Sequence, residues 1–137
     1  MKRTDAMASA TVTCYAYDAL HRVTSITYPS GAYASATPPK YFVYDAATIS
    51  GNTMLNAKGR LAEAYTGSSK TTDLGFSYSA RGELTDVWQS STHSGGYYHV
   101  AAGYWPTGPQ GLVKTLVLLN ASNQPLSGLP TWTYHSA

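Results

Sequence analysis

The sequence is poor in charged residues, and this scarcity limits the partners that it can bind. Only 12% of its 137 residues are charged, about half of the roughly 25% usual in soluble domains. Nine Lys and Arg against seven Asp and Glu give a net charge of +2, and only Lys2 and Arg3 adjoin each other. Because nucleic-acid-binding domains carry basic stripes, we predict that the chain has no nucleic-acid partner.

Cysteine and long apolar runs are also scarce. The single cysteine, Cys14, excludes an internal disulfide. It alternates with Val12 and Ala16, which favours a small buried side chain over a nucleophile. The longest aliphatic run covers residues 116–119, which is too short to span a membrane. The sequence also shows no targeting signal.

Motifs that carry enzyme chemistry are missing as well. The sequence has no G-x-S-x-G nucleophile elbow and no glycine-rich phosphate loop. His93 and His99 flank Gly95 and Gly96 without the closely spaced partners that a zinc site requires, so we interpret them as exposed loop and strand residues. We therefore predict no catalysis, no cofactor and no metal.

Strand-forming residues dominate what is present. The chain holds 12 Tyr and 3 Trp, and Gly, Pro, Ser and Thr interrupt nearly every window that could form a helix. In residues 74–78, Leu74, Phe76 and Tyr78 share one face and Gly75 and Ser77 share the other. We predict a single all-β, antiparallel region over residues 1–137. Further expectations are disorder in residues 1–10, strands at 11–17 and 114–119, and a loop or short extra hairpin at 46–55.

A repeated unit explains the spacing of these strands. The segment YDALHRVTSIT (17–27) aligns with YSARGELTDVW (78–88), and NAKGRLAEAY (56–65) and YWPTGPQ (104–110) follow the same register. The motif residues that we predict to shape the repeats are Tyr17, Asp18, His21, Arg22, Tyr44, Asp45, Asn56, Gly59, Arg60, Tyr78, Ser79, Gly82, Tyr104 and Gly108.

Each unit predicts a hairpin turn. A strand ends at an aromatic residue, an Asp, Asn or Ser then accepts backbone N–H bonds, and a glycine three residues later adopts positive φ. His21 occupies the glycine position of the first unit. Asp18 and Asp45 could be paired catalytic carboxylates, but Asn56 and Ser79 at the equivalent positions favour turn formation. The predicted turns lie at 18–21, 56–59, 79–82 and 105–108.

These motifs resemble the YD repeats of the rearrangement-hotspot (RHS) family. Tyr17-Asp18-Ala19-Leu20-His21-Arg22-Val23, Tyr44-Asp45 and Asn56-Ala57-Lys58-Gly59-Arg60-Leu61 carry the resemblance, which covers residues 12–110 and about four repeats of a longer array. It implies an antiparallel ribbon that coils into a hollow, cocoon-like shell. It also implies a structural, non-catalytic role in a secreted or cell-surface protein, in toxin encapsulation or adhesion, with neighbouring repeats of a parent protein as partners.

Two further expectations concern binding. Tyr97, Tyr98, Trp105 and Trp132 could form a surface on which sugar rings stack, so a carbohydrate-binding module is the alternative function. Residues 129–134 favour a strand, and no charged residue follows Lys114. Because an unprotected edge strand pairs with other edges, we expect the chain to self-associate there.

Overall fold

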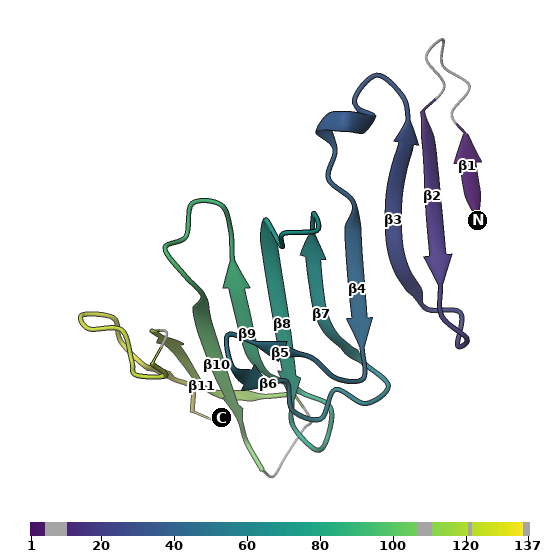
Figure 1. The fold of residues 1–137 in the computed structure, drawn as a ribbon. Coiled ribbons are helices and arrows are strands. Elements are labelled where there is room, and N and C mark those ends of the chain that lie inside the picture. Colours follow the sequence, from purple (N-terminus) through teal and green to yellow (C-terminus); the bar gives the residue numbers. More distant parts are fainter. Residues whose placement is uncertain (5–10, 107–110, 121, 136–137) are drawn as a thin grey trace.

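The computed structural model describes residues 1–4, 11–106, 111–120 and 122–135, and it confirms the all-β prediction. Over these residues the only helix is a single 3-10 turn at Ala34–Ala36, and no helix is long and apolar enough to cross a membrane. Ten strands form one open antiparallel sheet in the order β1-β2-β3-β4-β7-β8-β9-β10-β11-β12 (Figure 1). They are β1 (Lys2–Thr4), β2 (Val12–Tyr17), β3 (Val23–Ser30), β4 (Lys40–Tyr44), β7 (Leu61–Thr66), β8 (Thr72–Tyr78), β9 (Leu84–Ser90), β10 (Tyr98–Tyr104), β11 (Val113–Leu119) and β12 (Trp132–Thr133).

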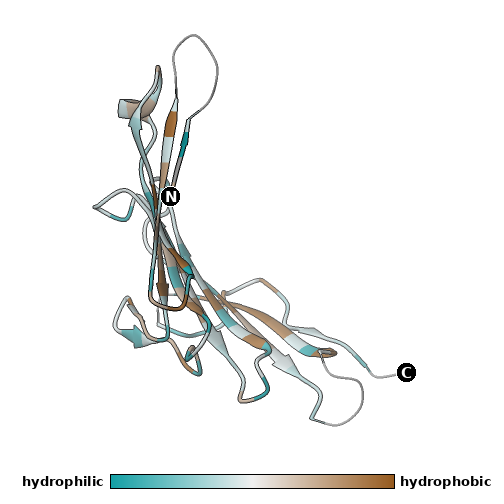
Figure 2. Cartoon of the chain, turned by 90° about the vertical axis from the view of Figure 1, so that its right-hand side faces the viewer, coloured by the Kyte–Doolittle hydropathy of each residue, from teal (hydrophilic) through white to brown (hydrophobic). Residues whose placement is uncertain are grey.

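The insert between β4 and β7, expected to be a loop or a short extra hairpin, forms the hairpin. Its strands β5 (Thr48–Ile49) and β6 (Asn52–Thr53) pair with each other and are separate from the main sheet. Figure 2 shows the main sheet as one bent layer with this hairpin lying to one side of it. The hairpin therefore covers one face of the sheet.

The core of the molecule lies under this hairpin. Ile49, Met54 and Ala57 of the insert pack with Ala62 and Trp88 of the sheet, and all five are buried. The space is tight, because a Cβ at Gly75 would lie 2.5 Å from Ile49 Cγ1 and 3.0 Å from Met54 Sδ. A glycine in the middle of β8 thus permits the hairpin to approach the sheet closely.

This arrangement buries the less hydrophobic face of β8. Asp73, Gly75 and Ser77 are buried, whereas Leu74 and Phe76 are only half-buried on the other face. Strand register extends that second face across the sheet, and Figure 2 shows hydrophobic colouring along these strands. Its half-buried apolar side chains are Phe42, Ala64, Leu74, Phe76, Val87, Val100 and Leu118.

The two ends of the sheet correct two expectations. Residues 2–4, expected to be disordered, form β1 and pair with residues 12–14 of β2; residues 5–10 lie outside the described part. The last strand was expected over residues 129–134 but covers only Trp132–Thr133. The turn that ends at Leu129 and the proline at 130, which cannot donate a backbone N–H bond, delay its start.

Gly75→Ala should destabilise the fold by about 1–3 kcal/mol, because its methyl group would overlap Ile49 and force the insert hairpin away from the sheet. Urea denaturation of both proteins measures the effect. The matched control is Gly95→Ala, since nothing lies within 4 Å of a Cβ at Gly95. Equal unfolding midpoints for the two variants would show that the close approach at Gly75 does not matter.

Candidate functional site

One edge of the sheet collects the repeat turns, and the first turn shows their common geometry. The backbone N–H of Asp18 donates to the carbonyl of Arg22 (3.0 Å), and His21 N–H donates to the Asp18 carbonyl (3.0 Å). Asp18 Oδ1 accepts the N–H groups of Leu20 and Arg22, both at 2.9 Å. His21 has φ 60, the left-handed conformation that this turn requires.

The turn between β8 and β9 repeats this geometry with a serine. Ser79 N–H donates to the Glu83 carbonyl (2.8 Å), and Gly82 N–H donates to the Ser79 carbonyl (2.9 Å). Ser79 Oγ accepts the N–H groups of Arg81 and Glu83, each at 3.2 Å. A hydroxyl therefore replaces the carboxylate as the turn initiator, with longer hydrogen bonds.

The second turn corrects the alignment of Asn56 with Asp18. Asp45 takes that position, because its N–H donates to the Arg60 carbonyl (3.0 Å) and its Oδ1 accepts the Gly59 N–H (2.6 Å). Asn56 instead donates from its side chain to the Tyr78 carbonyl of the next repeat (2.7 Å). The insert hairpin therefore extends the loop of one ordinary repeat turn, and sequence spacing alone places the turn initiator wrongly.

The turn after β10 is longer than predicted. Trp105 N–H donates to the Leu112 carbonyl (3.1 Å), and Gly111 has φ 86. Gly108, the residue predicted for the glycine position, lies outside the described residues. Gly111 directly precedes Leu112, whose carbonyl accepts the N–H of the turn initiator. His21, Gly59 and Gly82 hold the same position in their own turns. The turn therefore extends from Trp105 to Leu112, and the predicted turn at 105–108 is wrong in its extent.

A fifth turn begins at Asn120, and the sequence did not reveal it. Asn120 N–H donates to the Gln124 carbonyl (2.8 Å), while Asn120 Oδ1 accepts the N–H groups of Ser122 (2.9 Å) and Gln124 (3.0 Å). Asn123 has φ 58, like His21 in the first turn. This turn follows β11 and lies at the opposite edge of the sheet from the other four, since Leu119 pairs with His99 near the start of β10, so it is not a further copy of the YD unit. Leu119 stands where that unit has its tyrosine.

The tyrosines of the turns connect successive repeats. Each is preceded by a register shift that marks a β-bulge. The phenol hydroxyl of each later tyrosine donates to the carbonyl of the first residue of the strand that precedes its own in the sheet. These bonds run from Tyr44 to Val23 (3.0 Å), from Tyr78 to Leu61 (2.8 Å) and from Tyr104 to Leu84 (2.7 Å).

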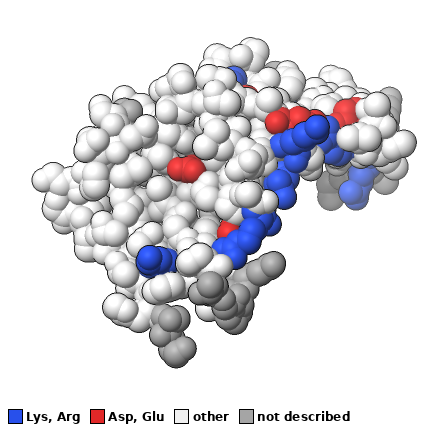
Figure 3. Space-filling view, turned by 90° about the horizontal axis from the view of Figure 1, so that it is seen from below, with Lys and Arg blue, Asp and Glu red and all other residues white. Residues whose placement is uncertain are grey.

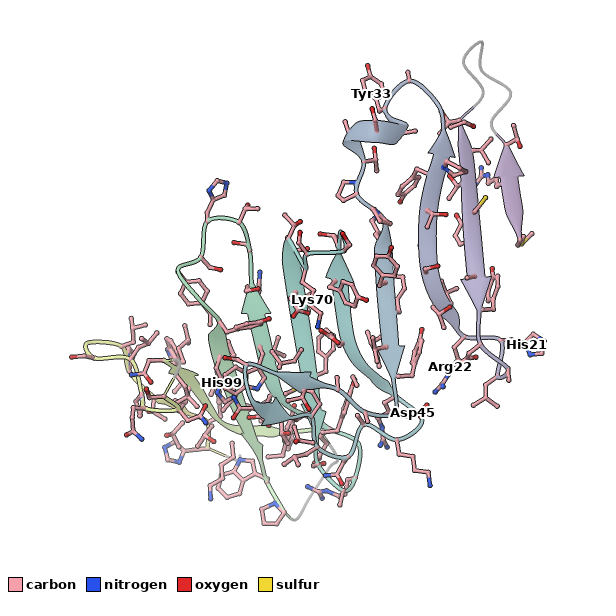
Figure 4. All side chains as sticks on the ribbon, viewed as in Figure 1. His21, Arg22, Tyr33, Asp45, Lys70 and His99 are labelled. Carbon is pink, nitrogen blue, oxygen red and sulfur yellow. The ribbon has the colours of Figure 1, made fainter. Side chains whose placement is uncertain are left out.

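Arg22 connects the first two turns electrostatically. Its Nε donates to Asp18 Oδ2 (2.7 Å), while Nη1 and Nη2 donate to the Asp45 carboxylate at 3.2 and 2.7 Å. The guanidinium also lies 4.4 Å from the centre of the Tyr44 ring. Figure 4 shows Arg22 and Asp45 side by side at the turn edge. The bond to Arg22 and the Gly59 N–H bond lower the pKa of Asp45 to about 2.

Arg60 and Arg81 also reach toward the next repeat, whereas Lys114 of β11 packs on the turn that leads into its own strand. Arg60 lies 5.5 Å from the centre of the Tyr78 ring, and Arg81 donates to the carbonyls of Trp105 (2.9 Å) and Pro106 (3.3 Å). Lys114 lies 4.9 Å from the centre of the Trp105 ring. Seen from below in Figure 3, Lys and Arg side chains form a row along this part of the molecule.

His99 corrects the prediction that the histidines are exposed. It is 5% exposed and stacks on Trp88, with ring centres 3.8 Å apart. Its Nε2 is 2.8 Å from Asp86 Oδ1, and its Nδ1 is 3.0 Å from Asn123 Oδ1. The side chain lies on the face of the sheet to which Trp88 belongs, so tertiary packing buries it.

A second buried polar cluster surrounds Lys70. The ammonium of Lys70 pairs with the Glu63 carboxylate and lies 3.8 Å from Asp73 Oδ2. The Tyr97 hydroxyl donates to the same Asp73 oxygen at 2.6 Å. Burial raises the pKa of Glu63. These groups partner one another, but Asp73 Oδ1 is buried without a hydrogen-bond partner among the described residues, so the cluster satisfies only part of the polar atoms on the covered face.

The four aromatic residues predicted to bind sugars are not brought together. Tyr97 is bound to Asp73, and its neighbour Tyr98 is 58% exposed at the start of β10. Trp105 follows the other end of β10, beneath Lys114, while Trp132 is 39% exposed in β12. A stacking platform needs adjacent rings, and these side chains do not provide one.

Comparison with known proteins supports the repeat assignment. The family model of the RHS repeat matches residues 1–33, which contain β1, β2, the first turn and β3. This match confirms the resemblance drawn from the YD motifs. No curated protein matches the chain.

Tyr78→Phe should lower the free energy of unfolding by about 1 kcal/mol, because it removes the hydroxyl that binds the Leu61 carbonyl. Tyr17→Phe is the matched control, since the Tyr17 hydroxyl has no hydrogen-bond partner among the described residues. Chemical denaturation compares the two variants. An equal loss in both would mean that the inter-repeat bond contributes nothing.

Asp45 should make the fold sensitive to acid. Its pKa is about 2 in the folded chain against 3.8 ordinarily, so its carboxylate stabilises the fold above about pH 4. That stability is lost as the pH falls toward 2. Asp45→Asn should therefore flatten the fall in stability over this range, as measured by thermal unfolding at a series of pH values. Parallel curves for the two proteins would contradict this role.

Proposed function

We propose that this chain is a structural, non-catalytic segment of an RHS-type β-shell. The observation that carries this proposal is the repeated hydroxyl bond from a turn tyrosine to the carbonyl of the preceding repeat. Each added repeat that carries the turn tyrosine can form one more such bond to the repeat before it. Such nearest-neighbour contacts are the basis of stability in repeat proteins.

The open sheet supports neighbouring repeats of a parent protein as its partners. A single layer buries only the face that another element covers, and the Leu74 and Phe76 side of the sheet is half-buried. β12 is the terminal strand of the sheet, and no charged residue follows Lys114. We propose that further repeats pair with this edge in the parent protein, and that isolated chains pair with one another there.

Variation at the turn-initiating position supports a role without catalysis. Asp18, Asp45, Ser79 and Trp105 occupy that position in the four turns at this edge. A catalytic carboxylate would not tolerate replacement by Ser or Trp, whereas a turn requires only a compatible backbone. By resemblance to other RHS proteins, we propose a place in a secreted or cell-surface protein, where such a shell serves in toxin encapsulation or adhesion.

A carbohydrate-binding module is the alternative, and it has less support. It rests on the exposure of Tyr98 and Trp132, at 58% and 39%. Tyr97 and Trp105 contact Asp73 and Lys114, so the four rings do not form one surface. The repeated turn contacts favour the scaffold.

Edge pairing gives the test of the scaffold role. The chain should elute earlier from a size-exclusion column as its concentration rises, and Thr133→Lys should reduce this shift, because a charge in β12 opposes pairing with another edge. Thr131→Lys, which adds the same charge just outside β12, is the control. Elution at the position of a monomer at every concentration would contradict an open edge.

A further inference from the structure

Nine basic residues are scattered along the sequence, but the fold gathers several of them at the turn edge. Lys58 and Arg60 belong to the second turn, Arg81 belongs to the third, and Lys114 lies in β11 just after the fourth. We call these four residues the cationic row. Contacts join its members: a Cβ at Gly82 would lie 2.6 Å from Arg60 Nη2, which places Arg60 against the turn that holds Arg81. Arg81 in turn binds the Trp105 carbonyl. Figure 3 shows such a row of blue side chains from below.

The first turn shows how a carboxylate binds at this edge. Arg22 holds Asp45 of the following turn through two hydrogen bonds, the paired geometry that makes Arg–carboxylate contacts strong. At the following turn, Ser79 stands where that carboxylate would be. Ser79 Oγ already donates to Glu83 Oε2 and accepts the backbone N–H groups of Arg81 and Glu83. Among the described residues, the Arg60 guanidinium binds no carboxylate, and its one hydrogen bond goes to the Asn56 carbonyl (3.0 Å).

The other members of the row also retain positive charge. Lys58 and Lys114 are exposed, and within the described part of the chain neither makes an ion pair. Arg81 is 38% exposed and pairs with Glu83. With Glu83 and Asp45, which accepts the Gly59 N–H beside Lys58, the row carries four positive charges and two negative charges, a net +2 gathered at one edge of the sheet.

Exposed leucines lie in the loops that hold these cations or at the start of the strand that follows. Leu55 is 59% exposed, Leu84 is 37% exposed and Leu112 is 45% exposed. Alternating cations and apolar side chains complement a segment that carries both carboxylates and apolar side chains. A polyuronic acid or a nucleic acid would satisfy the charges but would leave the leucines in water.

We propose that the cationic row binds a polypeptide segment rich in Asp, Glu and Leu, with one of its carboxylates on Arg60 in the way that Asp45 binds Arg22. This interaction goes beyond the scaffold role. It places a recognition surface for an acidic peptide on the turn edge, which reaches the neighbourhood of β12 at Lys114, whose carbonyl accepts the Tyr134 N–H (2.8 Å).

A labelled peptide of Asp, Glu and Leu tests this proposal by fluorescence anisotropy with the full chain. Binding should saturate and should weaken as salt is added. The same peptide with Asn and Gln should not bind. Lys58→Gln with Lys114→Gln should reduce affinity about tenfold, since two charge-assisted contacts are lost. Arg3→Gln with Lys40→Gln, which removes the same charge elsewhere, should leave the affinity unchanged.

A second double variant moves a carboxylate into the row without changing the net charge. Ser79→Asp with Glu83→Gln should supply Arg60 with an internal partner and so weaken peptide binding, while circular dichroism shows an intact fold. The proposal is overturned if the Lys58/Lys114 and Arg3/Lys40 double variants lose the same amount of affinity. It is also overturned if the Ser79/Glu83 variant binds the peptide unchanged, or if the native chain does not bind it at all. Tighter binding of polygalacturonate or single-stranded DNA than of the peptide would also overturn it.

Discussion

The hydrogen bond from a turn tyrosine to the carbonyl of the preceding repeat fixes how successive repeats of this sheet meet. A β-bulge precedes each tyrosine, and the ring then reaches the start of the adjacent strand. Tyr44, Tyr78 and Tyr104 make this bond to Val23, Leu61 and Leu84. Antiparallel strands can slip in register when one face is not fully buried, so the fixed contacts at Tyr44, Tyr78 and Tyr104 help to specify the register of this thin sheet.

The need to form the same turn in each repeat explains which positions of the repeat vary and which do not. The turn initiator needs only to start the turn, and Asp, Ser, Trp and Asn all do so here. The residue just before the one whose carbonyl accepts the initiator N–H needs positive φ, which His21, Gly82 and Asn123 all adopt. An ion pair such as that of Arg22 with Asp45 forms only where the next turn begins with a carboxylate. The third turn begins with Ser79, so Arg60 has no such partner and is available to another carboxylate.

Burial in this molecule follows the insert rather than the hydrophobic pattern. Alternation in β8 would suggest that Leu74 and Phe76 face a core, yet Asp73, Gly75 and Ser77 are the buried side. The insert supplies its own apolar residues, Ile49 and Met54, and these pack closely on Gly75, which has no side chain to obstruct them. Polar groups beneath it then find partners in one another, as Asp73 does in Tyr97.

The sequence by itself determined the all-β architecture and the repeat turns at Asp18 and Ser79, because strand alternation and turn chemistry act between residues close in the chain. It left the insert open between a loop and a short hairpin. It misplaced the second turn initiator, missed the turn at Asn120 and predicted an exposed His99. Those outcomes depend on contacts between distant residues: Asp45 with Gly59 across the insert, and His99 with Trp88 across two strands. The tertiary structure alone decided them, since only folding brings these pairs together.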